Sequence, residues 1–344
     1  MAYSTIIKPS DYMNTKLYTG NGSTNAQTGL GFQPDWVWLK GRSNSGSHKL
    51  MDAVRGSSSS LCSNNSNAAE GADYFSSFDS NGFTVNGTSN DINANGQTYV
   101  GWNWKANGQG SANTDGTVNS TYTSANTTSG FSIVQWTHTT SGNYTVGHGL
   151  NATPKMIIVK TTSAATNWGV YHSALTVGQR LILNSTSAQT TGYWGANAWN
   201  NNTFSIGSNR DSNGTTMIAY CFADVQGFSK AGSYVGNGNA DGTFVYTGFK
   251  PAWLLIKDKT RTEGWYIYDG KILGYNGQMG DFLANTTASV GTDYSIQVDL
   301  VSNGFKFQST TGHLNGSGEA FVYMAIAESP FVANSGESIP TTAR

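Results

Sequence analysis

The stretch Gly31–Lys40, GFQPDWVWLK, occurs in three versions along the chain. The second version is Leu150–Lys160, LNATPKMIIVK, and the third is Thr247–Lys257, TGFKPAWLLIK. In each version a turn is followed by a proline, and an apolar run then ends at a lysine. Proline fixes its own φ angle and favours extended geometry in the preceding residue, so the motif predicts entry into a buried strand. One strand used three times indicates three copies of one unit.

The spacing of the motif supports a true repeat. The final lysines are separated by 160−40 = 120 and 257−160 = 97 residues, and a polar insertion accounts for the difference. A turn before phenylalanine also recurs ahead of each penultimate strand, as SNGFTV at Ser80, NNTFSI at Asn201 and SNGFKF at Ser302. We therefore predict repeat 1 over residues 1–106, a Gly/Asn/Ser/Thr linker over 107–129, repeat 2 over 130–225, repeat 3 over 226–331 and a C-terminal tail over 332–344.

The composition predicts an all-β fold. Charged residues make up 11% of the chain, against roughly 25% in average proteins, and the 42 glycines suit many tight turns. A unit of about 95 residues is too long for a solenoid repeat and matches a β-sandwich. We predict three tandem β-sandwich domains of a jelly-roll, lectin-like kind. Since each unit can bury its own core, we expect separate beads; the alternative is a larger continuous sandwich formed by pairing neighbouring copies.

Charge and hydropathy argue against several classes of function. The net charge is −1 and there is no basic tract, so nucleic acid is not an expected partner. No apolar run approaches the roughly 20 residues that span a bilayer, so membrane insertion is not expected. The N-terminus, MAYSTIIKPSDY, lacks the pattern of a secretory leader. The two cysteines, Cys62 and Cys221, lie in different copies, which favours free thiols in a chain folded in a reducing cytoplasm.

No catalytic constellation is evident. A glycosidase needs two converging carboxylates, and the candidates do not recur in the three copies: Asp35, Asp52, Asp73, Asp258 and Asp269. At the position of Asp35 the other copies have Lys155 and Ala252. We therefore predict no catalytic residue and no enzyme activity, with a polysaccharide-degrading enzyme that uses a single copy as a rival hypothesis.

We predict no metal and no cofactor. The five histidines show no metal-ligand spacing. His48 and His172 occupy comparable positions in copies 1 and 2, and a half-buried strand residue explains both. Oxygen-rich turns occur at residues 113–116, 209–212 and 239–242, but none has the full spacing of a calcium loop. Ordinary turns in which an Asn or Asp side chain caps the backbone explain these segments better.

Two tryptophans are the candidates for ligand binding. Trp36 with Trp38, and Trp102 with Trp104, are two residues apart on predicted strands, and core packing explains them. Trp194 and Trp199 lie instead in the loop GYWGANAWNNN, together with Asn197 and Asn200. Flat aromatic rings beside amides suit stacking on sugar rings, so we predict a carbohydrate site there. The alternative is that the loop folds back on its own copy or packs against a neighbour.

Several motifs of copy 1 resemble a repeated domain in virion structural proteins of marine bacteriophages. The resemblance rests on LYTGNGS from Leu17, GFQPDWVWLKGRS from Gly31, DAVRG from Asp52, SNGFTV from Ser80 and YVGWNWKA from Tyr99. Proteins of this kind are described as tail-fibre-like or tail proteins of short-tailed phages that infect cyanobacteria and SAR11-type bacteria. Copies 2 and 3 keep the Pro–apolar–Lys strand and lose WNWK.

The resemblance implies a lectin-like β-sandwich protein in an oligomer on the virion surface, made in the host cytoplasm, with no known catalytic residues. We predict a tail-fibre or tail-tip component for host adhesion and receptor recognition, with other virion proteins and a host cell-surface glycan as partners. A homotrimer is expected by analogy with fibres. The absence of a heptad pattern and the early start of the first unit make a capsid-decorating or head-fibre protein the close alternative.

Overall fold

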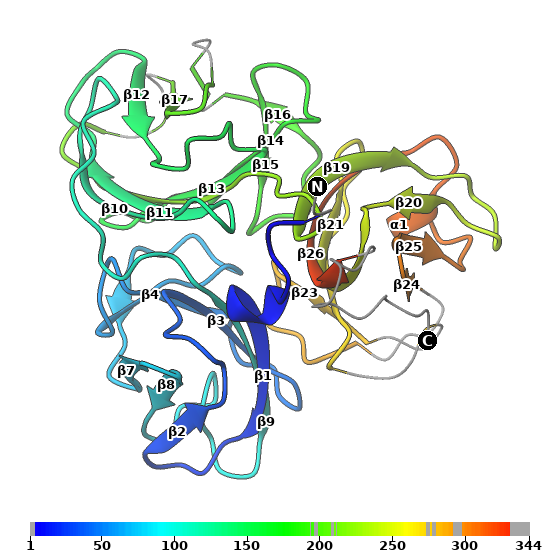
Figure 1. Cartoon of the computed structure of the whole chain (residues 1–344), viewed down its shortest axis with the longest axis horizontal. Helices are drawn as coiled ribbons and strands as arrows, with labels where there is room; N and C mark the ends of the chain where they lie inside the picture. The colour runs from blue at the N-terminus through cyan, green and yellow to red at the C-terminus, as the bar shows by residue number, and fades with distance from the viewer. Residues whose placement is uncertain are drawn as a thin grey trace.

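The computed structural model describes residues 4–192, 194–195, 199–207, 210, 212–272, 276, 280–291 and 298–330. Over these residues it has 26 β-strands and two single-turn helical segments, η1 (Pro9–Asp11) and α1 (Gly312–Asn315). The prediction of an all-β fold is confirmed. The chain forms three lobes that follow one another in sequence and meet at the centre (Figure 1). We refer to them as copies 1, 2 and 3.

Copy 1 has a main sheet of four strands in the order β1-β9-β3-β4 and a smaller sheet in the order β2-β8-β7. A two-stranded ribbon, β5-β6, lies beside them. The strands are β1 (Met13–Thr19), β2 (Asn25–Thr28), β3 (Trp36–Gly41), β4 (Lys49–Asp52), β5 (Ser59–Ser60), β6 (Glu70–Gly71), β7 (Phe75–Asp79), β8 (Gly82–Val85) and β9 (Thr98–Trp104).

Copy 2 repeats this plan with a wider main sheet, β10-β11-β18-β13-β14-β15-β16, and the pair β12-β17. The strands are β10 (Ser120–Asn126), β11 (Phe131–Thr137), β12 (Tyr144–Gly147), β13 (Met156–Thr161), β14 (Gly169–His172), β15 (Gln179–Ile182), β16 (Thr190–Thr191), β17 (Thr203–Ile206) and β18 (Thr216–Phe222).

Copy 3 has the main sheet β19-β26-β21-β22-β23 and the smaller sheet β20-β25-β24. The strands are β19 (Ser229–Val235), β20 (Phe244–Tyr246), β21 (Phe249–Asp258), β22 (Trp265–Asp269), β23 (Asp281–Leu283), β24 (Val298–Val301), β25 (Gly304–Phe307) and β26 (Ala320–Pro330). The repeated proline motif forms β3, β13 and the central part of β21, so the strand predicted from it is present in all three copies.

The segment that we predicted as a linker, residues 107–129, contains β10. This strand pairs antiparallel with β11 and forms the edge of the main sheet of copy 2. Its residues are mostly Ser, Thr and Asn, so the apolar alternation that marks a strand is missing. Backbone hydrogen bonds to a neighbouring strand order it instead, and these are independent of side-chain type.

Each copy has its own sandwich core. In copy 1, Val37 and Leu39 of β3 point between the two sheets and join Phe83 and Val85 of β8. Copies 2 and 3 have equivalent clusters around Phe204 and Phe305. Each unit therefore buries apolar residues of its own, as the sequence analysis predicted.

The other face of each main sheet is buried in a core shared by all three copies. Trp36 and Trp38 alternate with Val37 and Leu39 along β3, so they point to the opposite face, and both are almost completely buried. They belong to one cluster with Tyr220 of copy 2 and Trp253 of copy 3. The ring of Trp36 stacks on Tyr220 at 4.3 Å between centroids. The prediction of separate beads is wrong, because each main sheet is apolar on both faces.

The joints between copies repeat in a cycle. Trp168 Nε1 of copy 2 donates to Cys62 O of copy 1 at 2.8 Å. Trp265 Nε1 of copy 3 donates to Ile182 O of copy 2 at 2.9 Å. His48 Nε2 of copy 1 closes the cycle through Leu283 O of copy 3, 3.1 Å away. Because Trp38 Nε1 donates to His48 Nδ1, the proton of the neutral imidazole is on Nε2, as this bond requires.

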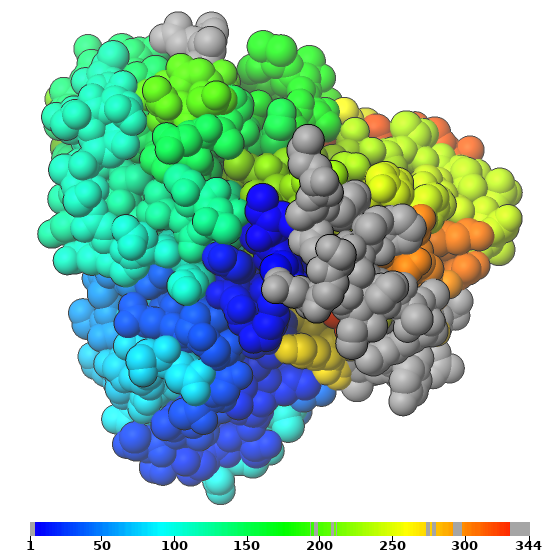
Figure 2. All heavy atoms as spheres, in the orientation of Figure 1, coloured from blue at the N-terminus to red at the C-terminus, as the bar shows by residue number. Residues whose placement is uncertain are grey.

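A second set of bonds joins the same pairs of copies, with donor and acceptor exchanged. Backbone N–H groups of Ala69, Gln189 and Val290 donate to the carbonyls of Thr162, Lys259 and Arg42 at 2.8–3.2 Å. Copy 1 thus donates to copy 2, copy 2 to copy 3 and copy 3 to copy 1. The single chain is therefore arranged around a pseudo-threefold axis. Figure 2 shows the N-terminal segment lying where the three lobes meet on one face.

The lysine that ends the repeated motif takes part in these joints. Lys40, Lys160 and Lys257 are completely buried. Lys40 Nζ donates to Gly46 O at 2.8 Å in its own copy and to Thr287 O at 3.0 Å in copy 3. Lys160 Nζ reaches Ser66 O of copy 1 at 3.3 Å. Lys257 Nζ donates to Asp258 O and Arg261 O of its own copy. A buried ammonium with several carbonyl acceptors thus orders the loop after the motif strand, and in copies 1 and 2 it also ties the copy to its neighbour.

The two cysteines, Cys62 and Cys221, are buried free thiols, as the sequence analysis predicted. In the part of the chain that the structure describes, no helix is both long and apolar enough to cross a membrane.

Candidate functional site

The predicted tryptophans lie in a small aromatic cluster on copy 2. The loop between β16 and β17 carries Trp194 and Trp199, and both rings are half-buried. Trp199 stacks on Tyr171 of β14 with 3.9 Å between centroids and an interplanar angle of 11°. Trp194 meets Trp199 edge-on at 5.2 Å and Tyr171 at 5.8 Å. We call these three residues the aromatic cluster.

The loop is held close to the sandwich. A Cβ atom built on Gly195 would lie 2.2 Å from Ser205 Oγ and 3.2 Å from Ile206 O of β17, so the backbone of the loop approaches this strand closely. Trp199 also packs near Phe204 at 6.1 Å. The indole N–H of Trp194 is buried and has no hydrogen-bond partner within the described residues. The described residues of the loop therefore lie against their own copy, and part of each tryptophan ring remains in solvent.

Asn200 has a structural task within this loop. Its Oδ1 accepts hydrogen bonds from the backbone N–H groups of Asn202 and Thr203, both at 2.8 Å. Its carbonyl accepts a bond from His148 Nε2 at 3.2 Å. Burial lowers the pKa of His148, so the imidazole is neutral near pH 7 and serves as a fixed donor. The other predicted amide, Asn197, lies outside the described residues.

The aromatic cluster is specific to copy 2. Register pairs Tyr171 with Ile157, and the equivalent residues, Met51 and Tyr268, pair with Val37 and Leu254. Met51 and Tyr268 are completely buried, whereas Tyr171 is half-buried. Burial of the Tyr171 ring nevertheless raises the pKa of its hydroxyl. Sequence reasoning missed Tyr171 because it reads as an ordinary strand residue.

The aspartates considered for catalysis are occupied by structural bonds, with one exception. Asp35 accepts from Ala106 N at 2.7 Å, and burial raises the pKa of its carboxyl. Asp258 accepts from the backbone of Thr260 and Arg261 in a turn. The exception is Asp73, which is exposed.

The remaining two aspartates lie at equivalent positions in the repeat. Asp52 pairs in register with Trp36 of β3, and Asp269 pairs with Trp253 of β21. Asp52 binds Arg55 Nε at 2.7 Å and accepts from the Tyr220 hydroxyl at 2.8 Å. Asp269 accepts from Thr15 Oγ1 at 2.5 Å and Trp102 Nε1 at 3.0 Å. Both carboxylates therefore serve the joints between copies.

The expectation that His48 and His172 are half-buried strand residues is wrong, because both are fully buried and His48 lies just before β4. His172 pairs in register with Met156, so it is equivalent to Asp52 and Asp269. His48 precedes β4 as Trp168 precedes β14, so it is equivalent to Trp168. The two histidines are thus not at comparable positions, because His48 lies just before the start of β4 whereas His172 is the last residue of the equivalent strand β14. No group of three metal-binding side chains is found in the described ranges.

The predicted calcium segments differ in what can be described. In the turn at residues 113–116, Asn113 Oδ1 accepts from Asp115 N at 2.9 Å, which is the side-chain-capped turn that we expected. In the third segment, Asp241 pairs with Lys306. Asn209 and Asp211 of the second segment lie outside the described residues.

Comparison with protein families gives a match over residues 8–330 to a family described as a domain of unknown function (DUF7483). No curated protein and no solved structure matches the chain.

Proposed function

The chain belongs to the DUF7483 family, whose function is unknown, and we propose that it is a non-enzymatic adhesion protein on the surface of a bacteriophage particle. In this proposal it is a tail-fibre or tail-tip component that recognises a glycan on the host cell. The aromatic cluster of copy 2 is the observation that carries the adhesion role. The phage setting rests on the sequence resemblance of copy 1.

The chemistry of the cluster suits sugar recognition. The half-exposed tryptophan rings offer flat apolar surfaces on which the C–H groups of a sugar can pack. The surrounding Asn, Gly and Thr residues offer neutral hydrogen-bonding groups. Sugars need both, since each pyranose ring has an apolar face and a rim of hydroxyls. The rigid body behind the loop reduces the ordering cost of binding. Several such proteins on one particle would raise avidity well above the affinity of one site.

A role without catalysis agrees with the use of the carboxylates. Glycoside hydrolysis requires two carboxyl groups facing the bond that is broken. The carboxylates of Asp52 and Asp269 instead accept hydrogen bonds from side chains of neighbouring copies. Incubation with host polysaccharide should therefore release no reducing sugar, and such release would restore the enzyme as the better hypothesis.

Capsid decoration is the second candidate, and the pseudo-threefold arrangement favours it. A compact body with three similar lobes suits a threefold position on a shell, and threefold symmetry is already present within one chain. The homotrimer remains a prediction, which sedimentation of the purified protein tests. Locating the chain on purified particles by electron microscopy distinguishes tail from capsid. Its absence from particles would contradict both roles.

A glycan array with the intact protein tests adhesion directly. We expect binding that Trp194→Ala and Trp199→Ala each weaken roughly two- to tenfold, since stacking on one ring contributes about 0.5–1.5 kcal/mol. Tyr246→Ala is the matched control, because Tyr246 is an exposed aromatic residue (50% accessible) on copy 3. Unchanged binding by both tryptophan variants would exclude the cluster as the site.

A further inference from the structure

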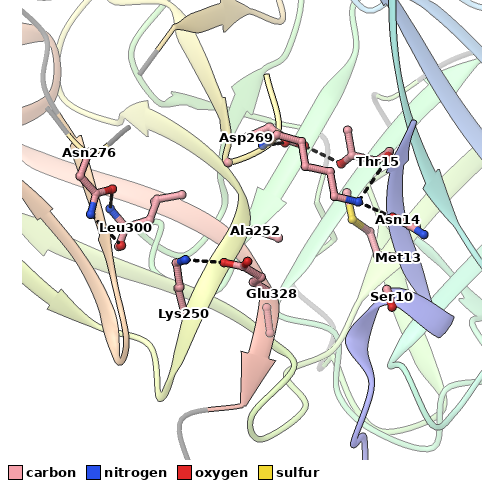
Figure 3. Close-up of a pocket in the computed structure, with 13 residues that line it drawn as sticks. Ser10, Met13, Asn14, Thr15, Lys250, Ala252, Asp269, Asn276, Leu300 and Glu328 are labelled. Carbon is pink, nitrogen blue, oxygen red and sulfur yellow. Dashed lines mark hydrogen bonds and ion pairs between the residues drawn. The ribbon is translucent and has the colours of Figure 1, made fainter. Parts of the chain in front are cut away.

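A pocket of about 520 Å³ lies at the joint between copies 3 and 1. Figure 3 shows η1 and β1 of copy 1 on one side and the ends of β21, β22 and β26 of copy 3 on the other. The joints between copies 1 and 2, and between copies 2 and 3, are each crossed by the chain itself. This third joint brings together the first and the last copy without a connecting segment among the described residues.

The pocket is lined by a small residue at a position where the other two copies have larger ones. Ala252 follows the motif proline and lines the pocket, where copy 1 has Asp35 and copy 2 has Lys155. In copy 1 the carboxylate of Asp35 occupies this position and binds Ala106 N. The strands β21 and β26 also extend further than their equivalents in copy 1, with 10 and 11 residues against 6 and 7. The longer strands provide an additional wall.

Two ammonium groups face this pocket. The side chain of Lys250 is 9% exposed, and its Nζ lies 2.6 Å from Glu328 Oε2. Lys271 Nζ donates to Asn14 Oδ1 at 2.7 Å and to Thr15 O at 3.3 Å. An ammonium has three N–H donors, so each lysine retains donor capacity beyond the bonds formed with described residues. Copy 1 has Gln33 and Val54 at the positions equivalent to these lysines.

The carboxylates at the pocket limit the charge of a ligand. Glu328 is exposed at the rim, and a dianion such as phosphate would lie close to it. Asp269 is buried in the wall, where its oxygens accept from Thr15, Trp102 and the backbone N–H of Lys271. Because two carboxyl groups, one exposed and one buried, lie beside the two ammonium groups, a singly charged carboxylate fits the pocket better than a doubly charged group does.

The remaining lining suits a polyhydroxylated ring. Met13, Ala252, Leu300 and Ala327 give an apolar floor, and the Ser10 hydroxyl lies at the edge. Binding sites of 300–1,000 Å³ that combine apolar walls with a few polar groups are typical for small ligands. We propose that this pocket binds a sugar that carries a carboxylate, of the uronic acid class. Its carboxylate is recognised by Lys250 and Lys271, and its hydroxyls by Glu328 and Ser10.

Isothermal titration of the full chain with glucuronate and galacturonate tests the proposal. We expect either uronate to bind at least roughly tenfold more tightly than glucose or galactose, because hydrogen bonds to a charged group are stronger than those between neutral groups. Equal affinity for acidic and neutral sugars, or no uronate binding, would overturn the proposal. Tighter binding of inorganic phosphate than of uronate would overturn it as well.

Two variants locate the site. Lys271→Gln changes an exposed side chain and should weaken uronate binding roughly tenfold. Ala252→Asp places the aspartate of copy 1 in the pocket and should abolish binding by repulsion and lost volume. Lys306→Gln is the matched control, because it removes an ammonium of copy 3 that pairs with Asp241 outside the pocket. If Lys306→Gln weakened binding as much as Lys271→Gln, the loss would reflect the overall charge of the protein, and the pocket would not be the binding site.

The proposal is independent of the aromatic cluster. Trp199→Ala should leave uronate affinity unchanged, even where it reduces binding on a glycan array. If Trp199→Ala lost uronate binding and Lys271→Gln kept it, the acidic sugar would bind at the aromatic cluster, and the proposal that it binds in the pocket would be wrong. Circular dichroism of each variant confirms that the sheets are intact before affinities are compared.

Discussion

The three joints use one position of the repeat in two opposite ways. At the joints from copy 1 to copy 2 and from copy 3 to copy 1, Asp52 and Asp269 are carboxylates that accept from side chains of the next copy. At the joint from copy 2 to copy 3, His172 occupies this position and donates from Nε2 to Tyr323 O at 3.1 Å. The geometry of the repeat therefore determines where the contact is made, but not whether this position donates or accepts the hydrogen bond.

The two carboxylate joints also differ from each other. Asp52 has a buried cation beside it, since the Arg55 side chain is 3% exposed. Asp269 accepts hydrogen bonds from the neutral side chains of Thr15 and Trp102. The cations Lys271 and Arg42 add only a charge interaction with it, without a hydrogen bond between described side chains. Removal of the same group should therefore leave a buried charge at one joint and unpaired neutral donors at the other.

The largest effect is expected for Asp52→Ala. This variant leaves the buried Arg55 without its carboxylate, and breaking a buried ion pair costs about 3–5 kcal/mol. Urea unfolding followed by tryptophan fluorescence measures the loss. The double variant Asp52→Ala/Arg55→Met should recover part of it, because the unpaired charge is then absent. A loss below about 1 kcal/mol in Asp52→Ala would contradict the role of the pair.

Asp269→Ala is the equivalent change at the other joint, and we expect a smaller loss. It deprives the Thr15 hydroxyl and the Trp102 indole of their acceptor, at a cost of about 1–3 kcal/mol. The same unfolding experiment measures it. Asp241→Ala in an exposed ion pair is the control and should cost little. If Asp269→Ala were as destabilising as Asp52→Ala, the unpaired charge of Arg55 would not add to the loss of stability, and the distinction between the two joints would be wrong.

The histidine joint should respond to pH. Burial lowers the pKa of His172 to about 4, below its ordinary value of about 6.5. The unfolded chain therefore binds a proton that the folded chain does not bind between pH 6.5 and 4. Stability from this group is complete above pH 6.5 and decreases as the pH falls, by about 1 kcal/mol between pH 7 and 5.5.

Thermal unfolding at both pH values tests this expectation in wild type and in His172→Gln. Only the difference between the two proteins reports on His172, because burial also lowers the pKa values of His48 and His148. An identical pH dependence in both would show that the joint does not titrate.

An effect of similar size is expected for Lys40, and it tests whether the joint contains a buried charge. Burial lowers the pKa of Lys40 to about 8, below its ordinary 10.5. As pH rises above 8 the folded chain releases a proton that the unfolded chain keeps, so stability increases. We expect a gain of about 1 kcal/mol between pH 7 and 9, which Lys40→Met should lack. If stability depended on pH in the same way in wild type and in Lys40→Met, the ammonium would be hydrated and its pKa would not be lowered.

Periodicity predicted much of the fold. The Pro–apolar–Lys motif predicted β3, β13 and part of β21, and the alternation of Trp36 and Val37 correctly separated the two faces of β3. The arrangement of the copies was not predictable in this way. A strand that is apolar on both faces reveals that both are buried, but not whether the second cover is part of the same copy or of a neighbour.

The candidate site was predicted only in part. Trp194 and Trp199 stood out because they are aromatic residues in a polar loop, whereas Tyr171 and His148 lie in segments without such contrast. The pocket was not predictable, because Ser10 and Glu328 lie at opposite ends of the described chain and meet only through the pseudo-threefold arrangement. Strand β10 was missed because backbone pairing leaves no mark on side-chain pattern.

The shared core has a consequence for biosynthesis. Copy 1 leaves the ribosome first, and its main sheet then presents Trp36, Trp38, Trp102 and Trp104 to water until two further copies have been made. Thr15 finds Asp269 only 254 residues later. Domains of most multidomain proteins fold as they emerge from the ribosome. In this chain, an apolar, tryptophan-rich surface stays exposed during most of translation and must be kept from aggregating. A truncated chain should therefore precipitate or occupy chaperones, so that only complete chains accumulate in soluble form.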